Sequence, residues 1–229
     1  MLPTTDPQPF HELERVCVEL VSSLSSVSYN QSYYPHLVSV ALFSNCLEAG
    51  FAMVILSRGS TDGGHPILLR TLFESTARLM FIAGSPENNA LALERIDCEE
   101  MLRQTGKSPI QGEATETTEI RNLVCDRLTD LKKENVKRIT FKEILMQGKL
   151  ARQYPIYQQL CGVVHSQITP LLHNLANYQD KVVSFKLLRP YSEERRKALE
   201  EAAIAFLQLA ELNIHRALAK LQTPPAANK

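Results

Sequence analysis

Apolar residues recur with a helical period along most of the chain. Between Phe10 and Val27 they are spaced three and four residues apart, which places them on one face of a helix. Two longer apolar segments, Pro35 to Ser57 and His65 to Ala83, each have a proline near the start, where the first turn of a helix tolerates it. Similar patterns continue over residues 86–105, 119–135 and 140–147, from Pro155 onward, and over 192–221. The pattern predicts an all-α protein, a helical bundle of about six to eight helices with irregular connections.

A few segments depart from this helical pattern. Residues 181–188 alternate apolar and polar side chains and predict one short strand. Glycines and turn-forming residues predict loops at 59–64 and 106–118. Prolines make residues 1–9 a flexible arm, and residues 222–229 are expected to form a tail. Since no linker separates the helices, residues 10–221 are predicted to be a single helical domain.

Composition narrows the class of protein. Hydrophobic residues make up 44% of the 229 residues and charged residues 22%, as in ordinary globular proteins. The 25 basic and 25 acidic residues cancel, so net charge does not signal RNA as a partner, although it leaves RNA open. Five scattered cysteines without a Cys-x-x-Cys pair indicate a reducing compartment, and we expect a cytoplasmic protein.

One apolar stretch, residues 38–56, is nearly long enough to cross a membrane. Glu48 lies near its middle, and a carboxylate there costs about 2.5–3.5 kcal/mol on insertion scales. A buried core helix is therefore the favoured interpretation, and no membrane partner is expected.

The segment from His65 to Ala83 is apolar on nearly every side, which predicts a central helix. Its charged exceptions, Arg70, Glu74 and Arg78, are spaced four residues apart and so form one stripe, in which Glu74 can pair with either arginine. The stripe is either a structural Arg–Glu–Arg network or, because buried charges are costly, a candidate site.

A second candidate lies in the helix that follows Pro155. His165 comes two turns after Tyr157, next to the apolar face, and a histidine has the pKa best suited to carrying a proton near neutral pH. We expect Arg70, Glu74 and His165 to lie together as candidate catalytic residues, with Tyr157 and Arg78 as further pocket candidates. No nucleotide-binding fingerprint and no complete set of metal ligands occurs, so neither a cofactor nor a metal is expected.

Two short motifs carry a resemblance to a known group of proteins. The motifs Arg70-Thr-Leu-Phe-Glu74 and Tyr157-x-x-Leu160-x-x-x-x-His165 resemble those of an uncharacterised family of bacterial helical proteins, which carry Arg-Ser/Thr-Leu-x-Glu and Tyr-x-x-Leu-Ser-x-x-x-His. The resemblance covers about residues 35–177, and Cys161 stands where that family has its serine.

That family is in turn similar to the HEPN superfamily of helical bundles. Many HEPN proteins are dimeric, metal-independent ribonucleases of toxin and phage-defence systems, and their signature is an arginine and a histidine with four to six residues between them. In this chain that spacing occurs at Arg58 and His65.

Two functions follow, and whether the protein is an enzyme stays open. The first is a non-catalytic helical protein-interaction module of a bacterial stress or phage-defence type system. The alternative is a HEPN-like metal-independent ribonuclease or toxin effector, with His165 as general acid/base and Arg70 stabilising phosphate charge. A homodimer is expected in either case, since the helices carry more apolar stripes than one small bundle buries, and a protein partner is expected for the module.

Overall fold

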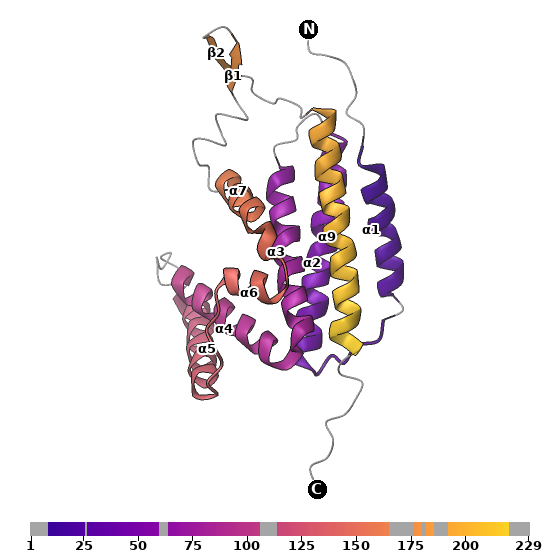
Figure 1. Cartoon of the computed structure of the whole chain (residues 1–229). Coiled ribbons are helices and arrows are strands. Elements are labelled where there is room, and N and C mark those ends of the chain that lie inside the picture. The colour runs from indigo at the N-terminus through magenta and orange to yellow at the C-terminus, as the bar shows by residue number, and fades with distance from the viewer. Residues whose placement is uncertain are drawn as a thin grey trace.

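The structure, a computed structural model, describes residues 9–25, 27–59, 64–105, 114–164, 176–179, 182–185 and 192–219. These residues form eight α-helices, one 3₁₀ turn and two short strands (Figure 1). The helices are α1 (His11–Leu24), α2 (Tyr34–Ser57), α3 (His65–Gly84), α4 (Pro86–Thr105), α5 (Ala114–Lys133), α6 (Phe141–Gln147), α7 (Tyr154–Val164) and α9 (Glu193–Ala219), and the 3₁₀ turn η1 is Ala151–Gln153. The predicted all-α class is confirmed.

The helix boundaries follow local signals in the sequence. Pro35 and Pro66 lie in the first turns of α2 and α3, where a missing backbone N–H costs no hydrogen bond. Thr140 and Glu143 form a capping box at the start of α6, in which each side chain accepts a hydrogen bond from the other residue's backbone N–H. The loop predicted at 106–118 was wrong in its last part, because α5 already begins at Ala114.

The strand β2 (Val182–Phe185) lies inside the segment where alternation predicted a strand. It pairs antiparallel with β1 (Ala176–Gln179), Ala176 lying opposite Phe185 and Gln179 opposite Val182. The partner strand was not predicted. The long helix predicted from Pro155 is described as far as Val164, and its expected continuation over 165–175 lies outside the described residues.

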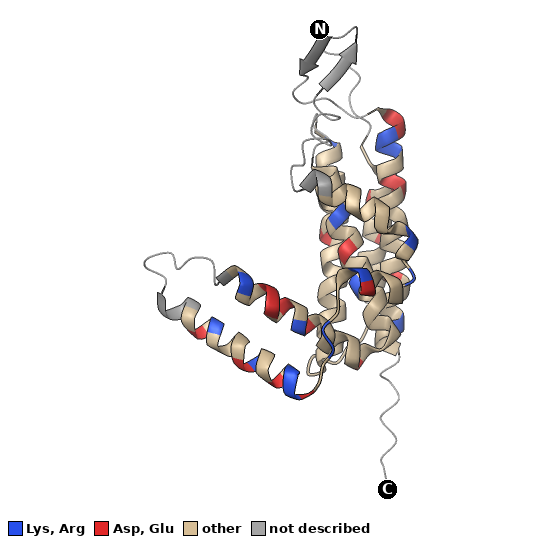
Figure 2. Ribbon diagram, turned by 60° about the vertical axis from the view of Figure 1, so that its left-hand side comes forward, with Lys and Arg blue, Asp and Glu red and all other residues tan. Residues whose placement is uncertain are grey.

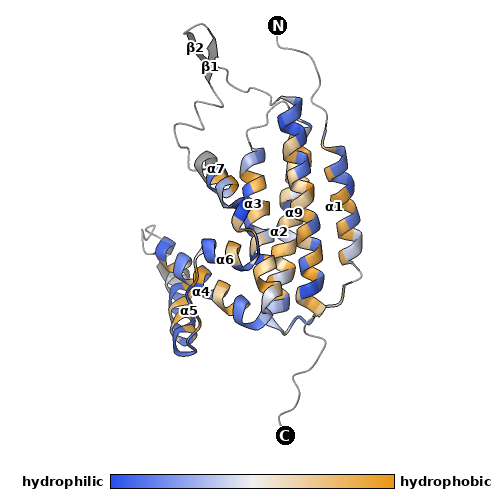
Figure 3. Cartoon of the chain, viewed as in Figure 1, coloured by the Kyte–Doolittle hydropathy of each residue, from blue (hydrophilic) through white to orange (hydrophobic). Residues whose placement is uncertain are grey.

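The core is built by α2, α3 and α9, which contact one another, with α1 packed against α2 and α9. α1 and α9 alternate apolar and polar residues, as helices with one buried face do (Figure 3). Close packing of α2 depends on Gly50, because a Cβ atom there would lie 2.8 Å from Cys17 Sγ and 3.2 Å from Leu207 Cδ1.

The central position predicted for the helix from His65 is occupied by α3, which contacts α2, α4, α6, α7 and α9. Leu72, Phe73 and Leu79 are completely buried. The Thr76 hydroxyl donates a hydrogen bond to the Phe206 carbonyl of α9 at 3.3 Å. Because α3 also packs against α7 and α4, the charged side chains of α3 can contact residues of these two helices.

The helices α4 and α5 form a hairpin that projects from the bundle (Figure 2). From here on, the arm means this hairpin and not residues 1–9. Two hydrogen bonds of 2.7 Å join Arg127 of α5 to the Glu94 carboxylate of α4. At the base of the arm, Leu128 and Leu131 are buried, whereas Leu123 nearer its tip is 70% exposed.

One helix in the described part of the chain, α2, is long and apolar enough to cross a membrane by length and composition alone. In its most apolar 18-residue window, 44% is buried inside the protein.

Candidate functional site

Arg70 and Glu74 form a hydrogen-bonded ion pair on α3. The distance from Arg70 Nε to Glu74 Oε1 is 2.8 Å, and the side chains are 19% and 28% exposed. Burial opposes the charged form of Arg70, but the hydrogen bond and the negative charge of Glu74 outweigh it, so the pKa of Arg70 is raised. The Arg70 guanidinium is thus held charged in a half-buried position.

Tyr157 of α7 covers this pair. The Arg70 guanidinium lies over the Tyr157 ring, 5.7 Å from its centroid, a cation–π geometry. Burial raises the pKa of the Tyr157 hydroxyl, and hydrogen bonding to Cys161 and the charge of Glu74 raise it further. The hydroxyl therefore stays protonated at neutral pH and acts as a donor, which suits a carboxylate neighbour.

Aromatic rings hold Tyr157 in this place. Its ring stacks on Phe73 of α3 with centroids 5.7 Å apart and lies 4.6 Å from the ring of Phe141 of α6. Phe73 also meets Phe206 of α9 edge-on at 5.1 Å. The sequence brings these rings together because each occupies the apolar face of its own helix, and the resulting cluster links α7 to the core.

The third member of the charged stripe, Arg78, pairs elsewhere. Its Nη1 lies 3.4 Å from Asp97 Oδ1 of α4, and its buried Nε makes no hydrogen bond within the described residues. Glu74 therefore pairs with the arginine one turn before it, and Arg78 helps to hold the base of the arm.

The described residues do not include His165, so its distance from Arg70 and Glu74 stays a prediction. The described residues do include Arg58 and His65, the pair with the HEPN-like spacing. His65 is completely buried, with Nε2 3.2 Å from the Met53 carbonyl and its ring 5.0 Å from that of Phe10. Arg58 is exposed and binds Glu14 of α1 at 2.6 Å. His65 thus occupies a structural position inside the bundle, out of reach of a substrate.

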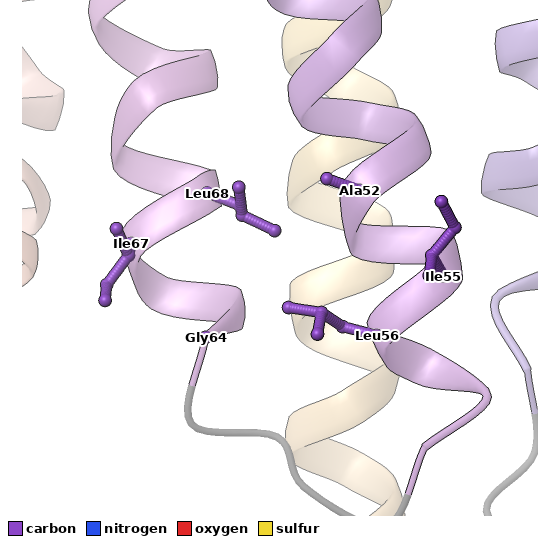
Figure 4. A pocket seen from close by; sticks show the side chains of 6 residues that line it. All are labelled: Ala52, Ile55, Leu56, Gly64, Ile67 and Leu68. Atoms are coloured by element: carbon purple, nitrogen blue, oxygen red, sulfur yellow. The ribbon is translucent and has the colours of Figure 1, made fainter.

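An open apolar hollow of about 380 Å³ lies between the C-terminal turns of α2 and the N-terminal turns of α3. Ala52 and Leu56 of α2 point toward Leu68 of α3 across it, on the side of these helices away from α9 (Figure 4). Ile55 and Ile67, also in its wall, are 67% and 47% exposed. A side chain at Gly64 would clash with Leu56, since its Cβ would lie 2.7 Å from Leu56 Cδ1. The sequence showed the apolar residues but not that the other described residues would leave them uncovered.

In the part of the chain that the structure describes, no group of three or more His, Cys, Asp or Glu side chains gathers as metal ligands do. The sequence also gave no sign of two contacts that matter for the site. Asp97 as the partner of Arg78 and Phe141 against Tyr157 both depend on how helices pack, and spacing within one helix carries no information about them.

The fold and these residues define a class: an all-helical bundle with a half-buried Arg–Glu–Tyr cluster on its central helix. The chain matches a family of unknown function, DUF5677, over residues 36–182, and it belongs to that family. No curated protein and no solved structure matches this chain. The family is uncharacterised, as the sequence resemblance implied.

Proposed function

We propose that this protein is a non-catalytic helical module that binds another protein in the cytoplasm of a bacterium, within a stress or phage-defence type system. The observation that carries the proposal is the hollow between α2 and α3. None of its six lining residues has an ionisable group, and the hollow is bordered by two exposed isoleucines. Chemistry needs a proton carrier or an electrophile, whereas an apolar groove suits an apolar helix face of a partner.

The state of the charged cluster supports the same function. The Arg70 guanidinium is engaged by the Glu74 carboxylate and by the Tyr157 ring, and aromatic packing fixes the tyrosine. An arginine that stabilises a phosphate needs free donors directed at the substrate. Here Arg70 gives its Nε donor to Glu74 and its guanidinium face to Tyr157 of α7, so the cluster joins α3 to α7.

The alternative, a HEPN-like ribonuclease, places the chemistry on His165 with Arg70 and Glu74 beside it. The Arg70 and Glu74 side chains are 19% and 28% exposed, so a substrate could contact them. This alternative is therefore tested as well.

The test combines a nuclease assay with cross-linking in cells. We expect purified wild type and His165→Ala to leave cellular RNA intact and to be equally non-toxic when expressed. A photo-reactive amino acid at Ile67, beside the hollow, should cross-link one discrete protein. The matched control is Leu212 on α9, which is also 47% exposed; a cross-linker there should give no such product. RNA cleavage by wild type that His165→Ala abolishes without lowering the melting temperature would establish the ribonuclease instead.

A further inference from the structure

The outward side of α2, here called the outer face, carries six residues spaced three and four apart. They are Leu37, Ala41, Asn45, Glu48, Ala52 and Ile55. Leu37 is 43% exposed and Ile55 67%, and Ala41, Asn45 and Glu48 are also exposed. The outer face therefore runs the length of α2 without another helix of the described chain covering it.

This composition is unusual for a helix that faces water. Glu48 is the only Asp, Glu, Lys or Arg between Tyr34 and Ser57. α2 is apolar enough to cross a membrane, and yet less than half of its most apolar window is buried. Solvated helix faces are normally polar, whereas four of the six outer-face residues are apolar, and exposed apolar residues grouped on one face mark an interaction surface.

The order of residues on the outer face is nearly the same in both directions. From either end it runs from a large apolar residue to an alanine and then to a polar residue. The midpoint falls between Cys46 and Leu47. A two-fold axis through that midpoint sets Ala41 opposite Ala52 and Asn45 opposite Glu48 of a second copy.

We propose that the outer face of α2 docks on the same face of a second copy of this chain, antiparallel and about a two-fold axis. This inference rests on the proposed function and makes a second copy of this chain the protein that the apolar hollow binds. The Ala41–Ala52 contacts let the helices approach to about 8–10 Å between axes. Each Asn45 amide donates to the Glu48 carboxylate of the partner copy, which occurs twice by symmetry.

The hollow beside α3 receives the end of the second helix. In this register Leu37 of the partner copy lies opposite Leu56, whose side chain lines the hollow. Ile67 and Leu68 form its other wall. The exposed leucine at one end of α2 thus enters the apolar space at the other end.

The polar pair at the midpoint decides between a second copy and a lipid surface. In a bilayer, a carboxylate at the centre of the helix costs roughly 2.5–3.5 kcal/mol, and an unpaired amide adds to this. In the dimer the same two groups satisfy each other. A second copy is therefore the occupant that pairs the two alanines and the two polar residues of the outer face.

The inference is tested by changing the charge at Asn45 alone, in the full chain, and measuring the dimer dissociation constant by sedimentation equilibrium. Asn45→Lys places a cation opposite Glu48 of the partner copy and should tighten the dimer several-fold. Asn45→Glu places two carboxylates together and should weaken it at least tenfold. The double variant Asn45→Glu/Glu48→Lys restores opposite charges and should recover dimerisation, which a merely damaged surface would not do.

The control is Leu212→Glu, which puts the same new charge at an exposed position on α9 and should leave the dissociation constant unchanged. A wild type that stays monomeric at 100 µM, or a dimer insensitive to both Asn45 variants, overturns the inference. A monomer that still cross-links another protein through Ile67 leaves the proposed function standing. RNA cleavage dependent on His165 removes the proposed function but not the dimer.

Discussion

At the scale of single residues, the main question is what the half-buried ion pair of α3 contributes. Arg70 and Glu74 are more exposed than a fully buried pair, so losing one partner leaves the other with access to water. The cost of breaking the pair is then nearer to that of one charged hydrogen bond than to the 3–5 kcal/mol of a dry pair.

Glu74→Ala is expected to lower the free energy of unfolding by about 1–3 kcal/mol, because it leaves the Arg70 guanidinium half-buried without its carboxylate. Urea denaturation measures this. The double variant Arg70→Ala/Glu74→Ala should recover part of this loss, because it removes both charges, and a double-mutant cycle then gives the coupling energy of the pair. Glu100→Ala, which breaks an exposed pair with Arg103, is the control and should cost less than about 0.5 kcal/mol. An equal effect at both sites would show that the α3 pair is not structurally important.

His36 makes a second residue-scale prediction. Its side chain is 7% exposed, and its Nδ1 accepts a hydrogen bond from the Asn30 backbone N–H at 2.9 Å, so the folded state needs a neutral ring. Burial lowers the pKa of His36 below its usual value of about 6.5, although the nearby backbone of Leu218 opposes this. The unfolded chain therefore binds the proton more readily. Stability from this group is complete above about pH 6.5 and is lost as the pH falls from there through the lower pKa of the folded state.

Thermal melts of wild type between pH 8 and pH 5 should show the melting temperature decreasing below about pH 6.5. His36→Gln keeps a hydrogen-bond acceptor but does not titrate, so its melting temperature should change less over that interval. His215→Gln, at an exposed histidine on α9, should behave as wild type. A wild-type slope retained in His36→Gln would assign the pH dependence to another group.

At the scale of elements, Gly50 sets the packing of α2 against α1 and α9. Gly50→Ala gains about 1 kcal/mol of helix propensity, but its new Cβ lies 2.8 Å from Cys17 Sγ, and overpacking typically costs about 1–3 kcal/mol. We expect net destabilisation in wild type, measured by urea denaturation. In a Cys17→Ala background the sulfur is gone, so the same substitution should cost little or nothing. An equal cost in both backgrounds would place the strain at Leu207 instead.

The sequence predicts the elements better than it predicts their contacts. Long periodic segments gave α2, α3, α4 and α9 nearly residue by residue, because proline positions and apolar stripes are local signals. The strand β1 was missed, since it exists through its pairing with β2. The ion pair on α3 was accessible from its four-residue spacing. Its cation–π contact with Tyr157 and the separate pairing of Arg78 with Asp97 were not, because both join different helices.

At the scale of the whole molecule, the segment shared with the family does not contain the complete core. Residues 36–182 include α3 but leave out α1 and α9, which lie outside the matched region. α9 contributes Phe206, which meets Phe73, and buries Leu207 and Ile214 completely. Its Arg196 donates to the Ser57 carbonyl at the end of α2 at 2.8 Å.

A fragment of residues 36–182 is therefore expected not to fold alone. Without α9 the buried side of α3, including Phe73 and Thr76, would face water, and burial of apolar area is the dominant favourable term in folding. Circular dichroism should show a broad, non-cooperative thermal transition for this fragment, and amide resonances should be poorly dispersed. The matched control, residues 9–219, keeps all described helices and should unfold cooperatively near the temperature of the full chain. A sharp transition in the 36–182 fragment would mean that α2 to α7 form a core of their own, and α1 and α9 would then be additions to a smaller domain.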